Sequence, residues 1–171
     1  MPRRLAVVTV LLLAAGLLAG CSSTVHLNAA DDANDPRCAD VTVRLTNVPA
    51  IDGHDRRWTD AQATAAWGDP SVVLLTCGLP EAEPTSTLQC VTRQGIDWLV
   101  DTSKTPLLTL TTYGRKPAVQ LFIDSTPNKG VSANDVIDNK SLAAAIATIP
   151  ATHACVERPG ADATPAPSPS N

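Results

Sequence analysis

The chain of 171 residues contains five cysteines, Cys21, Cys38, Cys77, Cys90 and Cys155. A chain of this length is expected to fold as one domain with a modest core, which disulfide bonds would reinforce. Whether the cysteines are bonded depends on the compartment, because disulfides persist mainly in exported proteins. The N-terminal sequence therefore decides how the cysteines are interpreted.

The N-terminal segment has the pattern of a lipoprotein signal peptide. Arg3 and Arg4 precede an uncharged apolar run, Leu5 to Ala19, whose 15 residues are fewer than the roughly 20 that span a bilayer. The run leads through small residues to Cys21, as in chains that are lipidated on the cysteine. The pattern predicts removal of residues 1–20 and an acylated, palmitate-bearing Cys21 at the outer, extracytoplasmic face of the cell membrane. An ordinary secretory signal or a short N-terminal anchor is the alternative.

The predicted mature chain is acidic. The whole chain has 13 basic and 17 acidic residues, a net charge of −4. Loss of Arg3 and Arg4 with the signal peptide leaves 11 basic residues against the same 17, a net charge of −6. Such a chain has little with which to neutralise phosphates, so no nucleic-acid partner is expected. The expected partners are the membrane, through Cys21, and an envelope protein or cell-wall component.

Both ends of the mature chain are polar or rich in proline. Residues 21–37 comprise the lipidated cysteine and a polar, irregular stretch that is expected to be a flexible tether. Residues 159–171 hold prolines among Ala, Ser and Thr and are expected to be a disordered tail. Between them, residues 38–158 are expected to form a single disulfide-stabilised domain.

Apolar runs in residues 38–158 predict mainly β-strands. Val41–Thr46 alternates apolar with polar residues, and Val72–Leu75 is a continuous apolar run that suits a buried strand. Further strands are expected at Leu88–Thr92, Ile96–Val100, Leu108–Thr111 and Val119–Ile123. Gly95 and the Lys116-Pro117 break each lie between two of these runs and predict two hairpins.

Two segments have helical patterns. Thr59–Trp67 is rich in alanine, begins with capping residues and is ended by Gly68. Leu142–Ile149 has apolar residues at helical spacing and is ended by Pro150. Strands joined by short turns, together with two helices, predict an α+β domain with a mostly antiparallel sheet of about five or six strands and two disulfides.

Four cysteines remain in the domain once Cys21 is assigned to the lipid. An even number in an exported domain predicts two disulfides, for which three pairings exist. Cys77–Cys90 is favoured because it closes a proline-rich excursion between runs taken as adjacent strands, and this leaves Cys38–Cys155. A metal site is the weaker alternative, since the chain has no CxxC motif and its histidines are not clustered at ligand spacing.

Short motifs of glycine, proline, cysteine and aromatic residues run through the domain. They are Trp67-Gly68-Asp69-Pro70, Cys77-Gly78, Cys90-Val91 with Gly95 and Trp98, and Thr112-Tyr113-Gly114-Arg115 with Pro117. Together they cover most of the stretch from Cys38 to Cys155 and resemble an actinobacterial family of lipoproteins, the domain of unknown function family three-five-one-five. The resemblance implies an exported, lipid-anchored domain with no established activity, and it supplies no catalytic residue.

Tyr113 and Arg115 are the first candidates for ligand binding. They flank Gly114 at the end of a predicted strand, where glycine permits a positive φ angle and leaves both side chains free. The Arg115 guanidinium can hold a carboxylate or phosphate at two points, with the Tyr113 ring stacking beside it. The alternative is a surface hairpin in which Arg115 pairs with a carboxylate of the protein itself.

Trp67, Asp69 and Trp98 complete the candidate set. In a chain with only 3% aromatic residues the two tryptophans are expected to anchor the core, and Asp69 is expected to stabilise a turn. The alternative is that all three line a ligand groove with the Tyr113 end of the sheet. Arg56-Arg57-Trp58 is a separate basic and aromatic cluster, either for anionic headgroups or wall polymers, or a solvated loop with Trp58 packed down.

No catalytic motif is present in the sequence. His54 and His153 are isolated, and no G-x-S-x-G, H-E-x-x-H or phosphate-binding glycine loop occurs. No catalytic residue, cofactor or metal is therefore predicted. The sequence favours a non-enzymatic binding or scaffolding module of the cell envelope. The alternatives are a binder of small ligands or cell-wall fragments at the Tyr113/Arg115 sheet end, and an envelope enzyme of unrecognised type.

Overall fold

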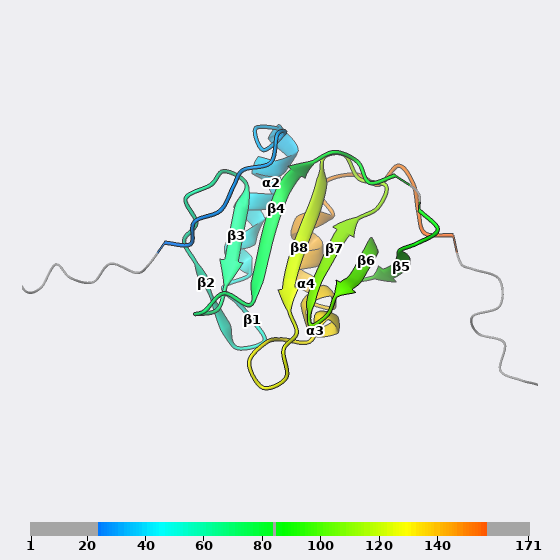
Figure 1. Ribbon diagram of the computed structural model, residues 1–171. Helices are drawn as coiled ribbons and strands as arrows, with labels where there is room; N and C mark the ends of the chain where they lie inside the picture. Colours follow the sequence, from blue (N-terminus) through cyan, green and yellow to red (C-terminus); the bar gives the residue numbers. More distant parts are fainter. Residues whose placement is uncertain (1–23, 84, 157–171) are drawn as a thin grey trace, which may run out of the picture.

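One antiparallel sheet, covered on one face by helices, makes up the protein in the computed structural model, which describes residues 24–83 and 85–156 (Figure 1). The predicted signal peptide, Cys21 and the C-terminal tail lie outside the described residues. The helices are α2 (Pro36–Arg44), α3 (Ala133–Ile137) and α4 (Lys140–Ile146), with the short 3-10 helix η2 (Leu45–Asn47). The strands are β1 (Ala50–Ile51), β2 (His54–Arg57), β3 (Thr64–Trp67), β4 (Val73–Leu79), β5 (Gln89–Arg93), β6 (Ile96–Lys104), β7 (Leu107–Thr112) and β8 (Ala118–Asp124).

The sheet consists of two meanders that meet at its centre. Its order is β1-β2-β3-β4-β8-β7-β6-β5, and every neighbouring pair is antiparallel. After β4 the chain crosses to the far edge, begins β5 there, and returns strand by strand to β8. A mostly antiparallel sheet with helices is thus confirmed, but the described residues form eight strands where five or six were predicted.

Both predicted hairpins are confirmed. The β5–β6 turn places Gln94 and Gly95 at φ angles of 49° and 74°, the left-handed pair that a two-residue hairpin turn requires. β7 pairs with β8 in a register that sets Leu110 opposite Leu121, and both side chains are buried. These elements depend on residues close in the sequence, which is why the sequence pattern predicts them.

The helix predicted at Thr59–Trp67 is wrong, because Thr64–Trp67 is strand β3. All four of its residues are buried, and it pairs with β2 on one side and β4 on the other. Alanine favours helices by itself, but its small side chain also fits a strand that is covered on both faces. Tertiary pairing therefore overrides the local preference.

The strand predicted at Val41–Thr46 is also wrong, because the segment belongs to helix α2 and to η2. Asp35 caps α2 by accepting a hydrogen bond from the Arg37 backbone nitrogen at 2.8 Å, and Pro36 occupies the first turn. The buried side chains are spaced three and four residues apart, at Cys38, Val41 and Leu45. This is the spacing of a helix face, whereas Val43 is 69% exposed.

The helix predicted at Leu142–Ile149 is confirmed as α4, but it ends at Ile146, three residues before the predicted end. The Asn139 side chain accepts a hydrogen bond from the Leu142 backbone nitrogen at 3.0 Å and so begins the helix. Leu142, Ile146 and Ile149 are fully buried between the helix and the sheet. The core thus lies on one face of the sheet, where all three helices pack (Figure 1).

Two disulfides are present, but the predicted pairing is wrong. Cys38 of α2 is bonded to Cys77 of β4, and Cys90 of β5 is bonded to Cys155 near the end of the described chain. The prediction of Cys77–Cys90 and Cys38–Cys155 treated β4 and β5 as adjacent strands. They are separated by β8, β7 and β6, because β4 lies at the centre of the sheet and β5 at its edge.

The described part of the predicted tether is packed against the domain. The Val25 backbone nitrogen donates to the Trp58 carbonyl at 2.8 Å, and the Asp32 nitrogen donates to the Gly78 carbonyl at 3.1 Å. Ala33 is buried and lies directly over Gly78, so that a Cβ atom added to Gly78 would overlap the Ala33 backbone. Residues 24–37 therefore belong to the folded structure and do not form a free linker.

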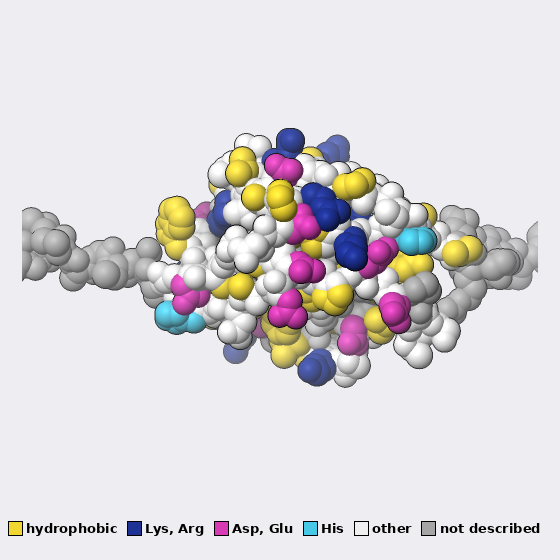
Figure 2. All heavy atoms as spheres, turned by 90° about the horizontal axis from the view of Figure 1, so that it is seen from above, with side chains coloured by type: hydrophobic (Ala, Val, Ile, Leu, Met, Phe, Trp, Pro, Cys, Tyr) yellow, Lys and Arg dark blue, Asp and Glu magenta, His cyan; other side chains and the backbone are white. Residues whose placement is uncertain are grey.

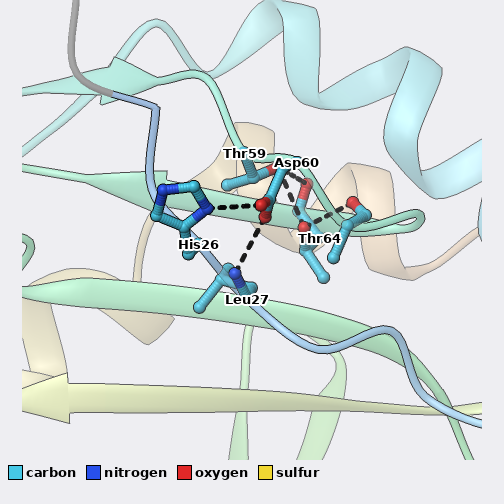
Figure 3. Close-up of polar contacts among 6 residues, drawn as sticks. His26, Leu27, Thr59, Asp60 and Thr64 are labelled. Carbon is cyan, nitrogen blue, oxygen red and sulfur yellow. Dashed lines mark hydrogen bonds and ion pairs between the residues drawn. The ribbon is translucent and has the colours of Figure 1, made fainter.

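Figure 3 shows how the N-terminal segment is held near its start. The two carboxylate oxygens of Asp60 contact His26 Nδ1 at 2.5 Å and the Leu27 backbone nitrogen at 3.0 Å. Beside them, the Thr64 hydroxyl donates to the Thr59 hydroxyl at 2.9 Å. No helix among the described residues is long and apolar enough to cross a membrane.

Candidate functional site

The two tryptophans of the candidate set are core residues. Trp67 and Trp98 are at most 1% exposed, on β3 and β6. The Trp67 indole nitrogen donates to the Val48 carbonyl at 3.1 Å. The Trp98 indole nitrogen is buried without a hydrogen-bond partner among the described residues. Neither ring is positioned to line an open groove.

Asp69 lies in the turn between β3 and β4, at the opposite end of the strands from Tyr113. Its carboxylate is 76% exposed and lies 2.6 Å from Nη1 of Arg57. Because β4 and β7 run in the same direction, the start of β4 and the end of β7 lie at opposite ends of the sheet (Figure 1). The structure therefore does not bring Asp69 together with Tyr113.

Arg115 is buried and only 5% exposed, which differs from its expected role as a free anion-binding residue. Its guanidinium donates to the Ile149 carbonyl and, at 3.3 Å, to the Gly95 carbonyl. Burial lowers the pKa of Arg115, and the nearby Asp97 charge partly opposes this effect. Arg115 thus joins the segment after α4 to the β5–β6 turn, and it has no free face for a ligand.

Tyr113 remains at the sheet end, within a group of polar side chains that we call the Glu81 cluster. It consists of Glu81, Tyr113, Thr152 and His153, which come from three separate segments of the chain. Ala82 forms a parallel bridge with Tyr113, and Ala151 forms an antiparallel bridge with Arg115. These bridges bring the segment after β4 and the segment after α4 together at the end of β7.

Gly114 permits this close approach. Its φ angle is 67°, and an added Cβ atom would overlap the backbone of His153. The Gly114 carbonyl accepts hydrogen bonds from the Thr152 nitrogen at 2.7 Å and from the Thr152 hydroxyl at 3.1 Å. The positive φ angle predicted for Gly114 is confirmed, and the packing of residues 151–153 is a second reason for glycine at this position.

The Glu81 carboxylate lies at the centre of the cluster. One of its oxygens accepts a hydrogen bond from the Thr152 hydroxyl at 3.1 Å and lies 3.1 Å from Nδ1 of His153. The His153 ring is 62% exposed, and its centroid lies 6.4 Å from that of Tyr113 with the planes tilted by 44°. The cluster therefore presents an aromatic ring, an imidazole and a carboxylate at the surface.

The segment that carries Thr152 and His153 is fixed at its far end. Cys155 is bonded to Cys90, and its backbone nitrogen donates to the Asp97 carboxylate at 3.0 Å. The other oxygen of Asp97 accepts a hydrogen bond from the Thr92 hydroxyl. Since both bonded partners belong to the β5–β6 hairpin, the edge of the sheet positions the imidazole.

The geometry of the cluster suits binding better than nucleophilic catalysis. In a catalytic triad the carboxylate contacts one imidazole nitrogen and the hydroxyl faces the other. Here Glu81 and the Thr152 hydroxyl both lie on the Nδ1 side of His153, the hydroxyl at 3.0 Å. Nε2 makes no hydrogen bond within the described residues, so it is available to a ligand hydroxyl or amide.

Sequence reasoning missed Glu81, Thr152 and His153 as a group. In the sequence His153 is an isolated histidine, and Glu81 and Thr152 are 71 residues apart. The crossing from β4 to β5, the two bridges at the end of β7 and the Cys90–Cys155 bond together bring the three residues close. Among residues 24–83 and 85–156, no group of three or more His, Cys, Asp or Glu side chains is placed to hold a metal ion.

Comparisons with known proteins agree with the resemblance of the motifs. No curated protein and no solved structure matches the chain. The model of one family, described as a protein of unknown function (DUF3515), matches residues 4–154. That match includes the whole sheet, the Cys38–Cys77 disulfide and the four residues of the Glu81 cluster, and it ends one residue before Cys155, so the chain belongs to the DUF3515 family.

Proposed function

We propose that the protein is a lipid-anchored, extracytoplasmic binding or scaffolding module of the cell envelope and not an enzyme. Supporting this proposal are the signal-peptide pattern that ends at Cys21 and the polar cluster without triad geometry. The membrane is reached through the lipid on Cys21. The binding partner is an envelope protein or a cell-wall component.

One observation carries the proposal: the two ends of the described chain lie at opposite sides of the sheet (Figure 1). Val25 bridges to Thr59 just before β3, whereas Cys155 is bonded to β5 at the far edge. β3 and β5 are five strands apart in the sheet order, which is roughly 24 Å at about 4.8 Å per strand. A lipid on Cys21 therefore leaves the half of the sheet with the Glu81 cluster free for a partner.

A binder of small ligands or cell-wall fragments is the second candidate, and the contacts of Glu81 favour it. Tyr113 and His153 supply two rings and Glu81 supplies a carboxylate within one surface group. Ligands rich in hydroxyl and amide groups, such as sugars and short peptides, are bound by this combination of stacking and hydrogen bonds. In this version Glu81 and His153, and not Arg115, supply the polar contacts, so the ligand is one with hydroxyl or amide groups and not the anion expected for Arg115.

The anchor is tested by mass spectrometry of the N-terminal peptide from the membrane fraction. We expect a diacylglycerol-bearing Cys21 as the first residue, and an unmodified cysteine there would refute the anchored form. Binding is tested by equilibrium measurements with soluble cell-wall fragments, comparing the native chain with Glu81→Gln, His153→Ala and the control Val43→Ala. Val43 is exposed on α2 and outside the cluster, so its loss should leave binding unchanged.

If none of the fragments binds, in-cell crosslinking distinguishes a protein partner. A photo-reactive residue at Val156, which is 91% exposed beside Cys155, should capture a defined envelope protein. The same residue at Val43 is the matched control. Failure to capture a protein at Val156, together with no fragment binding, would contradict the assignment of this half of the sheet as a binding surface.

A further inference from the structure

Trp58 is exposed to an extent that is unusual for its size. It is 78% exposed, whereas the other two tryptophans are at most 1% exposed. The chain has only five aromatic residues, three of them tryptophans, and one of these three tryptophans is exposed to solvent. Figure 2 shows a hydrophobic side chain standing out from the surface at the end of the molecule where the described chain begins. The interpretation of a loop with Trp58 packed down is therefore wrong.

The backbone of Trp58 is bonded to the first residues of the described chain. Its carbonyl accepts a hydrogen bond from the Val25 nitrogen at 2.8 Å, and the Asp60 nitrogen donates to the Val25 carbonyl at 3.3 Å. The Asp60 carboxylate also holds His26 and Leu27, as Figure 3 shows. Val25 is thus fixed next to Trp58 from both sides.

The site of predicted lipidation is close to this point. Val25 follows Cys21 by four residues. A chain spans at most about 3.5 Å per residue, so four residues reach no more than about 14 Å, whatever path they take. The headgroup region on one side of a bilayer is roughly 5–7 Å thick. Trp58 is therefore within reach of the interface that would hold the Cys21 lipid.

Few unpaired positive charges surround Trp58, since Arg56, which forms no ion pair among the described residues, is half-buried. Arg57 lies 2.6 Å from the Asp69 carboxylate, and His26 lies 2.5 Å from that of Asp60. A surface with one half-buried, unpaired arginine gains little from anionic lipids, whose attraction depends on clusters of lysine and arginine. The indole of Trp58 is the group that favours a membrane, because tryptophan prefers the level of the lipid headgroups.

We propose that Trp58 inserts into the headgroup region of the leaflet that holds the Cys21 lipid, as a second membrane contact of the domain. This proposal rests on the anchored form proposed above. The lipid holds the protein at the membrane, and Trp58 fixes which edge of the sheet faces it. The Glu81 cluster then lies on the half of the sheet turned away from the lipid.

The experiment uses the full-length acylated protein in phosphatidylcholine vesicles whose acyl chains carry bromine near the headgroup. Bromine quenches tryptophan emission only at short range. The fraction of the emission that the brominated lipid quenches is measured for the wild type and for Trp58→Phe. We expect quenching in the wild type and its loss in the variant, because Trp67 and Trp98 stay in the core. Acrylamide dissolved in the water should quench Trp58 less in the vesicle-bound wild type than in the Cys21→Ser variant, which carries no lipid and is measured free in solution without detergent.

A matched control places tryptophan at the opposite edge of the sheet. The double variant Trp58→Phe/Val156→Trp has its exposed indole beside Cys155, and we expect no quenching by the brominated lipid. Quenching at both positions would refute a fixed orientation. Flotation with the vesicles but no quenching of Trp58 would overturn the second contact and leave the anchor intact. Failure of the wild type to float would instead refute the anchor itself.

Discussion

We expect that removing the Cys38–Cys77 disulfide will destabilise the domain more than removing Cys90–Cys155, although it closes the shorter loop. The Cys38–Cys77 bond closes 39 residues and the Cys90–Cys155 bond closes 65. The entropy of loop closure gives about 3.9 kcal/mol for the first and about 4.3 kcal/mol for the second at 25 °C. Loop length alone therefore makes the Cys90–Cys155 bond slightly the more stabilising.

Burial reverses this order. Cys38 and Cys77 are fully buried in the core between α2 and β4, whereas Cys90 and Cys155 are partly exposed. Replacement by alanine at each buried site removes an atom the size of a methyl group and leaves a cavity that costs about 1 kcal/mol. The variant Cys38→Ala/Cys77→Ala should lose about 6 kcal/mol, and Cys90→Ala/Cys155→Ala about 4 kcal/mol. A domain has roughly 5–15 kcal/mol in total, so the first variant is close to unfolding.

Urea unfolding followed by the emission of the buried tryptophans measures both losses. The comparison uses a chain that begins at Ser22 and so lacks the lipidated cysteine. Equal losses, or a larger loss for Cys90→Ala/Cys155→Ala, would refute the argument from burial. Peptide mapping without reduction checks the pairing independently, and a peptide linking Cys77 to Cys90 would contradict the structure.

Three further predictions concern the contacts of the sheet end and of the N-terminal segment. Arg115→Met should cost about 2 kcal/mol in urea unfolding, because the buried Ile149 carbonyl loses its donor and the carbonyl of the exposed residue Gly95 loses a part-buried hydrogen bond. Gly114→Ala should cost about 2 kcal/mol or more and expose the segment after α4 to proteolysis, because its Cβ would lie 2.7 Å from the His153 nitrogen at a positive φ. The backbone hydrogen bond from Leu27, followed by that from His26, lowers the pKa of Asp60. The folded pKa is below the unfolded one, so the contact stabilises above about pH 4 and is lost as the pH falls through the folded pKa. The Leu27 amide shift should therefore titrate below the ordinary range of aspartate in NMR spectra, and Asp60→Asn should abolish that titration.

What the sequence predicts correctly depends on short-range patterns. The β5–β6 turn at Gln94-Gly95 and the apolar face of α4 are each determined by residues within a few positions of one another. The same reasoning fails for β3, because an alanine-rich segment is a helix former by itself and a strand only when its neighbours pair with it. Sequence reasoning also fails for α2, because the apolar residues of Val41–Thr46 are compatible both with a strand and with a helix that has one buried face.

Predictions that depend on topology are less successful. The disulfides were paired on the assumption that consecutive strands are adjacent, and the crossing from β4 to the edge strand β5 breaks that assumption. The glycine before Arg115 predicts an exposed side chain, but the segment after α4 returns to the sheet and covers it. Glu81 became a candidate only when this segment placed His153 beside it.

The packing of residues 24–37 changes how far the protein can search for a partner. A free linker from Cys21 to Cys38 would extend up to about 60 Å and let the domain sample a wide volume above the lipid. Because the Val25 nitrogen is hydrogen-bonded to the Trp58 carbonyl, only the chain from Cys21 to Val25 can extend, and it spans at most about 14 Å, less than the width of the sheet. The domain of a lipid-anchored form of this chain would therefore stay within a thin layer at the membrane surface. Partners in that layer would meet the domain at a high effective concentration. A polymer layer whose distance from the membrane exceeds the length of the domain would not be contacted.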